Sequence, residues 1–481
     1  MIPMHRWCAL AMAVSSITAC ALGPNYHRPN VDVTADYKEV GDWKASQPND
    51  ALSRGPWWEI YNDDALNQLE VRIEMSNENV KAAAAAFDQA RALVSQARAG
   101  FWPTVTASVS RQKNGGGTSA LVRNNGSLPL TSSSRSPVTN SAGLQAAWDL
   151  DIWGKIRRTT ESNRASAQAS AAALASARLS AQAALATDYF ELRVQDQLQM
   201  LLDDTVTAET QSLKIAQNRY NFGVAARADV VTAQTQLLSS QAQQVNAKIQ
   251  RALLEHAIAV LIGQQPAAFS LAPAPLRAGV PTVPAGIPST LLERRPDVAE
   301  AERKIAAGNA QIGVAQAAYF PDLTLSGSDD YTSISMSHLI RASNRVWSFG
   351  PALAQTLIDG GLRRARVAAA RASYEQTVDA YRQTVLTSFQ QVEDQIVTLR
   401  VLEQQTSIEE EVVKSSREAE SLTLNQYKAG TVPYSSVIAA QTARLSSEQA
   451  ALSVLSSRLQ SSVALIQAVG GGWDASQLPL P

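Results

Sequence analysis

The chain has 481 residues, enough for two or three average domains, and its 42 Lys and Arg nearly balance its 43 Asp and Glu, for a formal net charge of −1. Nothing in this charge indicates a nucleic-acid partner. The four histidines lack metal-ligand spacing, and no phosphate-loop or hydrolase motif occurs, so we expect no metal site, no catalytic residue and no enzyme.

Residues 1–19 are typical of a secretory signal peptide, because the apolar run at 7–17 is too short to span a bilayer. The end of this segment, 17-ITAC-20, resembles the bacterial lipobox. The resemblance implies a diacylglycerol on the sulfur of Cys20 and an acylated new N-terminus, with no other cofactor. Ala21 replaces the aspartate that retains lipoproteins in the inner membrane, which implies outer-membrane sorting. The alternative is an ordinary cleaved signal with an incidental cysteine.

The rest of the chain is a duplication. The stretch 218-NRYNFG-223 matches 425-NQYKAG-430, and 230-VVTAQTQLL-238 matches 437-VIAAQTARL-445, both at an offset of 207 residues. Between the copies, 264–288 contains six prolines and is predicted to be an extended linker.

Each copy is predicted to contain a helix, two strands, a long helix and a return helix. The expected ranges are 63–99, 102–113, 139–152, 155–220 and 227–262 in the first repeat (63–263), and 289–318, 321–331, 345–358, 361–428 and 434–469 in the second (289–470). A segment at 20–62 and a tail at 471–481 complete the mature chain. Gly223 and Gly430 are the expected turns after the long helices. At ~1.5 Å per residue the long helices reach ~100 Å, about the length of two shorter ones placed end to end.

The long helices carry an apolar stripe. In the second copy it recurs every seven residues, at Val378, Val385, Val392 and Leu399. In the first copy it includes Leu185, Tyr189 and Leu192. Such a repeat predicts left-handed supercoiling against neighbouring helices. Periodicity by itself leaves a hollow helical barrel and a solid coiled-coil bundle both open.

The strands are amphipathic. In 104-TVTASVS-110 the Thr and Ser residues share one face and the Val and Ala residues share the other. Pro351 makes the fourth strand the least regular, because proline cannot donate to a ladder. Aromatic residues at the strand ends resemble the interfacial girdle of outer-membrane proteins: Trp102, Trp148, Trp153, Phe320 and Trp347. Soluble hairpins with one buried face are the alternative, but the lipid anchor and the girdle favour membrane strands.

Four strands per chain are too few for a membrane barrel, which begins at about eight strands. Because lipid tolerates no unpaired sheet edge, several chains must combine. A dimer would supply eight strands and a trimer twelve, and twelve strands suit an open duct better. The polar segment 111–140 is predicted to lie outside the cell.

Several short sequence segments together resemble those of the TolC-like outer-membrane factors of tripartite efflux pumps, and within that family those of the NodT-type lipoprotein branch. They are 17-ITACALGPNYHRP-29, 148-WDLDIWGKIRR-158, 294-RRPDVAEAE-302, 319-YFPDLTLSGS-328 and 470-GGGW-473. The resemblance implies a mainly α homotrimer, with a twelve-strand outer-membrane barrel continuous with a twelve-helix periplasmic α-barrel. It assigns 20–62, the linker and the tail to an equatorial domain.

The resemblance also implies a function. The chain would be a passive exit duct for small toxic compounds or drugs, docked to a periplasmic adaptor (membrane fusion) protein and an inner-membrane transporter of the RND type. Two alternatives remain: a protein-secretion duct of a type I system, and an anchored coiled-coil periplasmic adaptor. Adaptors usually contain one helical hairpin, whereas this chain contains two.

The same family closes its tunnel near the glycine turns, which implies four gate candidates. Asp229, six residues after Gly223, matches a gating aspartate, and Tyr427 matches the gate tyrosine. Ser436 and Ala439 occupy the two equivalent acidic positions after Gly430 but carry no charge. The alternative for Asp229 is a carboxylate that interacts with the dipole of its own helix.

Overall fold

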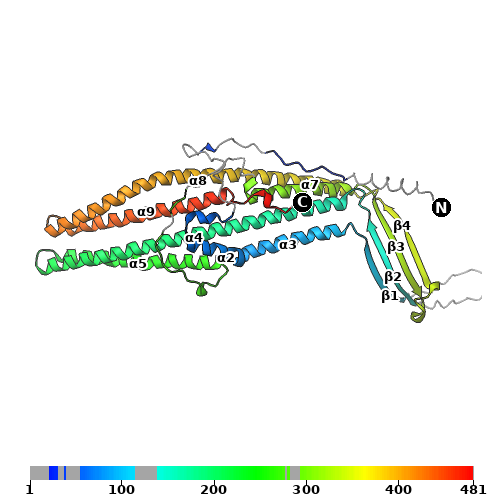
Figure 1. Cartoon of the computed structure of the whole chain (residues 1–481), viewed down its shortest axis with the longest axis horizontal. Helices are drawn as coiled ribbons and strands as arrows, with labels where there is room; N and C mark the ends of the chain where they lie inside the picture. The colour runs from blue at the N-terminus through cyan, green and yellow to red at the C-terminus, as the bar shows by residue number, and fades with distance from the viewer. Residues whose placement is uncertain are drawn as a thin grey trace, which may run out of the picture. The chain divides into compact units, whose positions relative to one another are not determined.

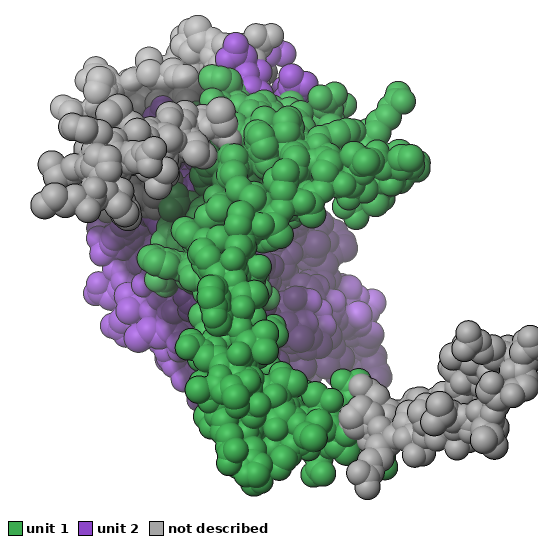
Figure 2. All heavy atoms as spheres, turned by 90° about the vertical axis from the view of Figure 1, so that its right-hand side faces the viewer, with its two compact units in different colours: residues 1–28, 89–167, 304–378 green, residues 29–88, 168–303, 379–481 purple. Residues whose placement is uncertain are grey.

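The computed structural model describes residues 21–30, 37–38, 55–113, 138–276, 279–281 and 293–479. The signal peptide, Cys20 and most of the segment predicted to lie outside the cell are beyond the described residues. The chain divides into two compact units (Figure 2). Unit 1 comprises Met1–Arg28, Gln89–Ala167 and Lys304–Val378, and unit 2 comprises Pro29–Asp88, Gln168–Arg303 and Asp379–Pro481.

The order helix, two strands, long helix and return helix occurs twice (Figure 1). The first copy contains α2 (Asp64–Ser76), α3 (Glu78–Ala99), β1 (Thr104–Lys113), β2 (Val138–Asp149), α4 (Lys155–Asn221) and α5 (Arg227–Leu261). The second contains α7 (Pro296–Ala317), β3 (Asp322–Ser333), β4 (Arg345–Ala354), α8 (Leu362–Ala429) and α9 (Tyr434–Ala468). The duplicated architecture predicted from the sequence is therefore confirmed.

Within the described ranges, no helix combines the length and apolar character needed to cross a membrane.

The first helix of copy one is not continuous, which corrects the prediction of a single helix over 63–99. Asn77 separates α2 from α3 in an extended conformation (φ −67°, ψ 121°). Its side-chain oxygen accepts hydrogen bonds from the backbone N–H groups of Asn79 (3.0 Å) and Val80 (3.1 Å), and so caps α3. Its side-chain nitrogen donates to the carbonyl of Leu261, at the end of α5 (2.7 Å). A partner 184 residues away thus stabilises the break.

An aspartate precedes each long helix. Asp151 adopts a positive φ of 46° and accepts hydrogen bonds from the backbone N–H groups of Ile156 (2.7 Å) and Arg157 (2.9 Å), at the start of α4. Asp359 accepts from Arg363 in the same way before α8 (3.1 Å). β2 stops at Asp149 and β4 at Ala354, which corrects the predicted limits at 152 and 358.

The core of unit 2 joins α4, α8 and α9 to the segment before α2. The predicted stripe residues Leu185, Tyr189 and Val392 are almost completely buried, as the periodicity predicted. Trp57 and Tyr61, from the short 3-10 helix Trp57–Tyr61, pack into the same cluster. The hydroxyl groups of Tyr61 and Ser462 lie 2.7 Å apart.

Unit 1 contains the sheet, with antiparallel strands in the order β1-β2-β3-β4. Its register places Val105 opposite Ala146, and Trp148 opposite Leu325, on one apolar face. The Thr and Ser residues share the opposite face, as the alternation predicted. Pro351 lies in β4, the last strand of this sheet, and pairs with Leu325 of β3.

Candidate functional site

The two long helices, α4 and α8, both end within unit 2, in similar glycine turns. Gly223 and Gly430 have φ values of 72° and 80°, a conformation that residues with a Cβ rarely adopt. After α4, the N–H of Val224 donates to the carbonyl of Arg219 (3.0 Å). After α8, the N–H of Thr431 donates to the carbonyl of Gln426 (3.0 Å). These bonds satisfy carbonyls that a helix end leaves without partners.

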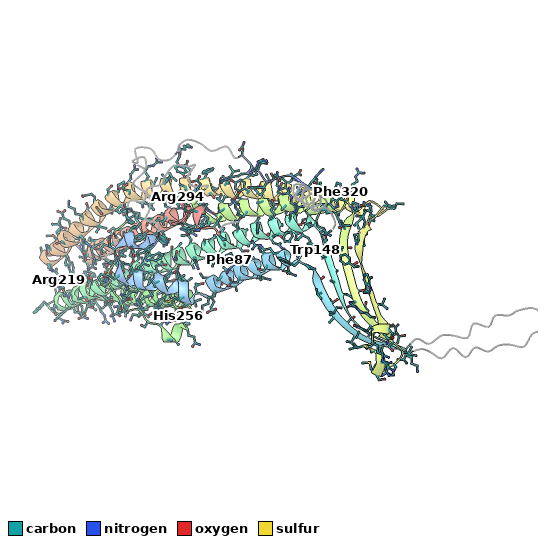
Figure 3. The ribbon with its side chains drawn as sticks, turned by 45° about the vertical axis from the view of Figure 1, so that its right-hand side comes forward. Phe87, Trp148, Arg219, His256, Arg294 and Phe320 are labelled. Carbon is teal, nitrogen blue, oxygen red and sulfur yellow. The ribbon has the colours of Figure 1, made fainter. Side chains whose placement is uncertain are left out.

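Arg219 joins the ends of α4 and α8 (labelled in Figure 3). Its Nη1 donates to the carbonyl oxygens of Tyr427 and Lys428, each at 2.8 Å. Its guanidinium also lies 4.7 Å from the centroid of the Tyr427 ring. A cation at the carbonyl end of a helix is stabilising. Sequence reasoning missed this residue, although the repeat alignment pairs Arg219 with the neutral Gln426.

Tyr427 is the centre of a small apolar cluster that we call the tip cluster. The cluster consists of Ala216, Ala233, Tyr427, Tyr434 and Val437. The rings of Tyr427 and Tyr434 meet edge to face with centroids 5.1 Å apart. Burial raises the pKa of Tyr434 to about 12, and it also raises the pKa of Tyr427. Both phenols therefore stay neutral at physiological pH.

The other gate candidates surround this cluster less closely. Asp229 is half-buried in the first turn of α5, and its negative charge contributes to the raised pKa of Tyr427. Within the described part of the chain the buried hydroxyl of Tyr427 has no hydrogen-bond partner, so it does not donate to Asp229. Ser436 is half-buried and Ala439 exposed on α9. The structure thus brings Tyr427 against Arg219 and Tyr434.

A network of charged side chains links α8 and α9 in the same unit. Arg444 Nε lies 2.6 Å from a carboxylate oxygen of Glu420, and Arg444 Nη1 lies 2.7 Å from Glu448. Arg417 binds the other oxygen of Glu448 (2.6 Å). These salt bridges keep the pair in register beyond the tip cluster, and the sequence analysis did not identify them.

In unit 1 the predicted girdle residues divide between the two ends of the sheet. Trp148 and Phe320 lie where the strands meet the helices (Figure 3). Trp148 Nε1 donates to the carbonyl of Phe101 (2.9 Å), next to the 75% exposed Trp102. Trp153 stacks on Phe320 with ring centroids 4.7 Å apart. Trp347, which pairs with Asp329, lies toward the opposite end. The predicted girdle residues thus lie toward both ends of the sheet.

The polar face of the sheet is hollowed. A cavity of about 300 Å³ is lined by hydroxyl, amide and small side chains of all four strands: Thr104, Thr106, Gln145, Ala146, Ala147, Ser326, Gly327, Ser328 and Ser348. The hydroxyls of Ser328 and Ser348 lie 3.0 Å apart across the β3–β4 pair. One face of the sheet is therefore wettable and the other apolar.

Comparison with known proteins matches the chain to the family model described as outer membrane efflux protein, over residues 71–264 and 287–471. These ranges cover the first repeat from residue 71 onward and the whole of the second repeat. The chain belongs to the outer membrane efflux protein family.

Relatives match this outer membrane efflux protein over nearly its whole length. The probable efflux pump outer membrane protein TtgC of Pseudomonas putida is 28% identical over 97% of this chain and 95% of its own. Nodulation protein T of Rhizobium leguminosarum bv. viciae is 29% identical over 99% of this chain and 96% of its own. The solved outer-membrane channel OprN has a TM-score of 0.86 at 27% identity, covering 94% of this chain and 100% of its own. The CmeC outer membrane channel of Campylobacter jejuni, 21% identical, shares the fold with a TM-score of 0.86, covering 95% of this chain and 96% of its own.

These matches confirm the TolC-like fold class and the outer-membrane location, with the helices extending into the periplasm. The family consists of channel proteins. In the described part of this outer membrane efflux protein, no group of three or more His, Cys, Asp or Glu residues could hold a metal ion.

Proposed function

We propose that the protein is the passive exit duct of a tripartite efflux system that exports small toxic compounds or drugs. The observation that carries the proposal is the full-length match to outer membrane efflux proteins, combined with a sheet that has one polar face. Relatives at 28% identity are named for antibiotic, toluene and solvent efflux. These names favour small organic cargo over the secretion of proteins.

The functional assembly is a homotrimer. The α5 helix carries exposed apolar residues at Val231, Leu238, Val245, Ile249, Leu253 and Val260. At 100° per residue they fall within a stripe about 80° wide. The α8 helix exposes a second stripe that includes Val401, Ile408 and Val412. Neighbouring copies would bury the two stripes against each other, and β1 of one copy would pair with β4 of the next, so that three chains close one twelve-stranded sheet.

The partners are a periplasmic adaptor and an inner-membrane transporter of the RND type. Phe222 and Val224 flank Gly223 and are 83% and 63% exposed. Apolar side chains on a turn between long helices suit contact with another helical protein. This surface supports adaptor docking at the end of the α4–α5 hairpin.

The lipid anchor belongs to the same proposal. Cys20, outside the described residues, would carry diacylglycerol and an N-acyl chain; several acyl chains anchor a protein stably. We expect Cys20→Ser to abolish metabolic labelling with palmitate. Labelling of this variant at the wild-type level would refute the anchor.

The assembly is tested by cross-linking in isolated outer membranes followed by gel sizing, and by conductance in planar bilayers. The proposal predicts a band near three chain masses and discrete channel openings. The proposal would be contradicted by monomers without a trimer band. It would also be contradicted if correctly folded protein produced no channel conductance in the bilayers.

A further inference from the structure

The apolar face of the sheet ends in a group of cations on the side away from the helices. The residues are Arg111 and Lys113 on β1, Arg345 on β4, and Arg341 just before β4; all are exposed. Alternation along β1 puts Arg111 and Lys113 on the same face as Val105 and Val109. Basic side chains on the lipid-facing side of a membrane sheet are costly unless they lie at an interface.

The position of these cations fits the height of a membrane. Trp148 lies next to the pair Thr104–Ala147, at the helical end of the sheet. From Thr104, β1 rises ~24 Å to Arg111 and ~31 Å to Lys113. With a strand tilt of ~40°, the vertical distances are ~18 Å and ~23 Å, against an apolar band ~25 Å tall. Lys113 therefore lies at the far border of the band, and Arg111 reaches it by extending its side chain.

Among the described residues, no acidic group neutralises Arg111 or Lys113. Across the strand pair, Arg111 faces the neutral Asn140, and Lys113 faces Val138. Among the described strand residues, Asp329 is the acid on this face, and Arg345 binds both of its oxygens at 2.7 and 2.9 Å. Neither Arg111 nor Lys113 forms an ion pair within the described ranges. They remain available for an anion outside the chain.

We propose that Arg111 and Lys113 bind the phosphate groups of lipid A in the leaflet at the loop end of the sheet. The positive charges of Arg111 and Lys113 complement the negative charges of the phosphate groups. The acyl chains of such a lipid would lie along the apolar surface formed by Val105, Val109 and Leu144. This inference rests on the membrane insertion of the sheet in the proposed function.

The test uses the full-length protein in a neutral detergent, titrated with diphosphoryl lipid A, phosphatidylglycerol or phosphatidylethanolamine and read by native mass spectrometry. The double variant Arg111→Gln/Lys113→Gln is expected to bind lipid A about tenfold or more weakly, since each cation contributes about fivefold. The charge-preserving variant Arg111→Lys/Lys113→Arg should retain binding. As a matched control, Arg227→Gln/Lys248→Gln removes two exposed cations from α5.

Equal lipid A binding by the wild type and the glutamine variant would overturn the inference. So would wild-type protein that holds phosphatidylglycerol as tightly as lipid A. Conductance of the same samples separates this inference from the duct itself. Normal conductance with unchanged lipid A binding in the variant refutes only the lipid site, whereas absent conductance with selective lipid A binding refutes only the duct.

Discussion

Nη1 of Arg219 in α4 lies 2.8 Å from the carbonyl oxygen of Tyr427 in α8, which ties together helix ends from different repeats. The same nitrogen binds the carbonyl of Lys428, and the guanidinium covers the Tyr427 ring. The two hairpins of one chain are therefore fastened to each other at their glycine turns, where the resemblance to TolC-like factors puts the gate.

Replacing Arg219 with alanine should loosen this connection. Each hydrogen bond from a charged donor contributes about 1.5–3 kcal/mol, so the open population should rise about tenfold or more. The expected readouts are higher single-channel conductance and greater sensitivity to a large antibiotic that normally does not enter. Arg227→Ala, an exposed cation in the first turn of α5, is the control. If Arg219→Ala and the wild type show equal antibiotic leak, the hydrogen bonds from Arg219 to α8 do not restrict opening of the channel.

Asp229→Ala should also increase conductance and antibiotic leak if three copies form a partial acidic ring. Ser436→Ala, at the equivalent position of the second repeat, should behave like wild type. Unchanged conductance and antibiotic leak in Asp229→Ala would leave this residue as a helix N-terminal carboxylate.

Asp196 holds the proline-rich linker against α4 and α5. Its carboxylate accepts hydrogen bonds from Arg193 (2.9 Å), Arg251 (2.7 Å) and the backbone N–H of Ala274 (3.0 Å). Asp196→Asn removes the acidic partner of the buried Arg193 and should lower the free energy of unfolding by about 3–5 kcal/mol, whereas the half-buried Arg251 keeps its salt bridge to Glu255. Thermal unfolding should show a clear fall in Tm. Asp379→Asn breaks an exposed pair with Arg382 and should cost less than about 1 kcal/mol, so similar Tm values for both variants would contradict this account.

Glu70 in α2 is fully buried, and neither of its carboxylate oxygens has a hydrogen-bond partner among the residues that the structure describes. Burial raises its pKa to about 9, so the folded protein holds this proton more tightly than the unfolded chain does. The protonated carboxyl group makes its full contribution to the free energy of unfolding below the unfolded pKa of about 4.3. This contribution is lost as the pH rises toward 9, which lowers the free energy of unfolding by an amount on the order of a few kcal/mol.

Glu70→Gln should therefore flatten the fall in Tm between pH 5.5 and pH 9. Glu74→Gln, on the exposed side of the same helix, should keep the wild-type slope. Identical slopes in Glu70→Gln and the wild type would mean that the carboxyl finds a partner in the assembled protein.

Much of the fold could be predicted from local patterns. The seven-residue spacing of Val378, Val385 and Val392 identified the buried face of α8, and the alternation in 104–110 identified the two faces of β1. The repeat itself located both glycine turns. These features depend on the periods of helix and strand, which any segment displays without reference to the rest of the chain.

Only the tertiary structure decided the contacts between distant segments. Arg219 and Tyr427 are 208 residues apart, and Asn77 and Leu261 are 184 apart. The helix break at Asn77 and the hydrogen bonds from Arg219 to α8 could not be predicted from the sequence. Periodicity shows which side of a helix or strand is apolar, but it does not show which partner covers that side. The sequence thus determined the elements, their faces and their duplication, whereas three-dimensional packing decided which polar side chains fasten them together.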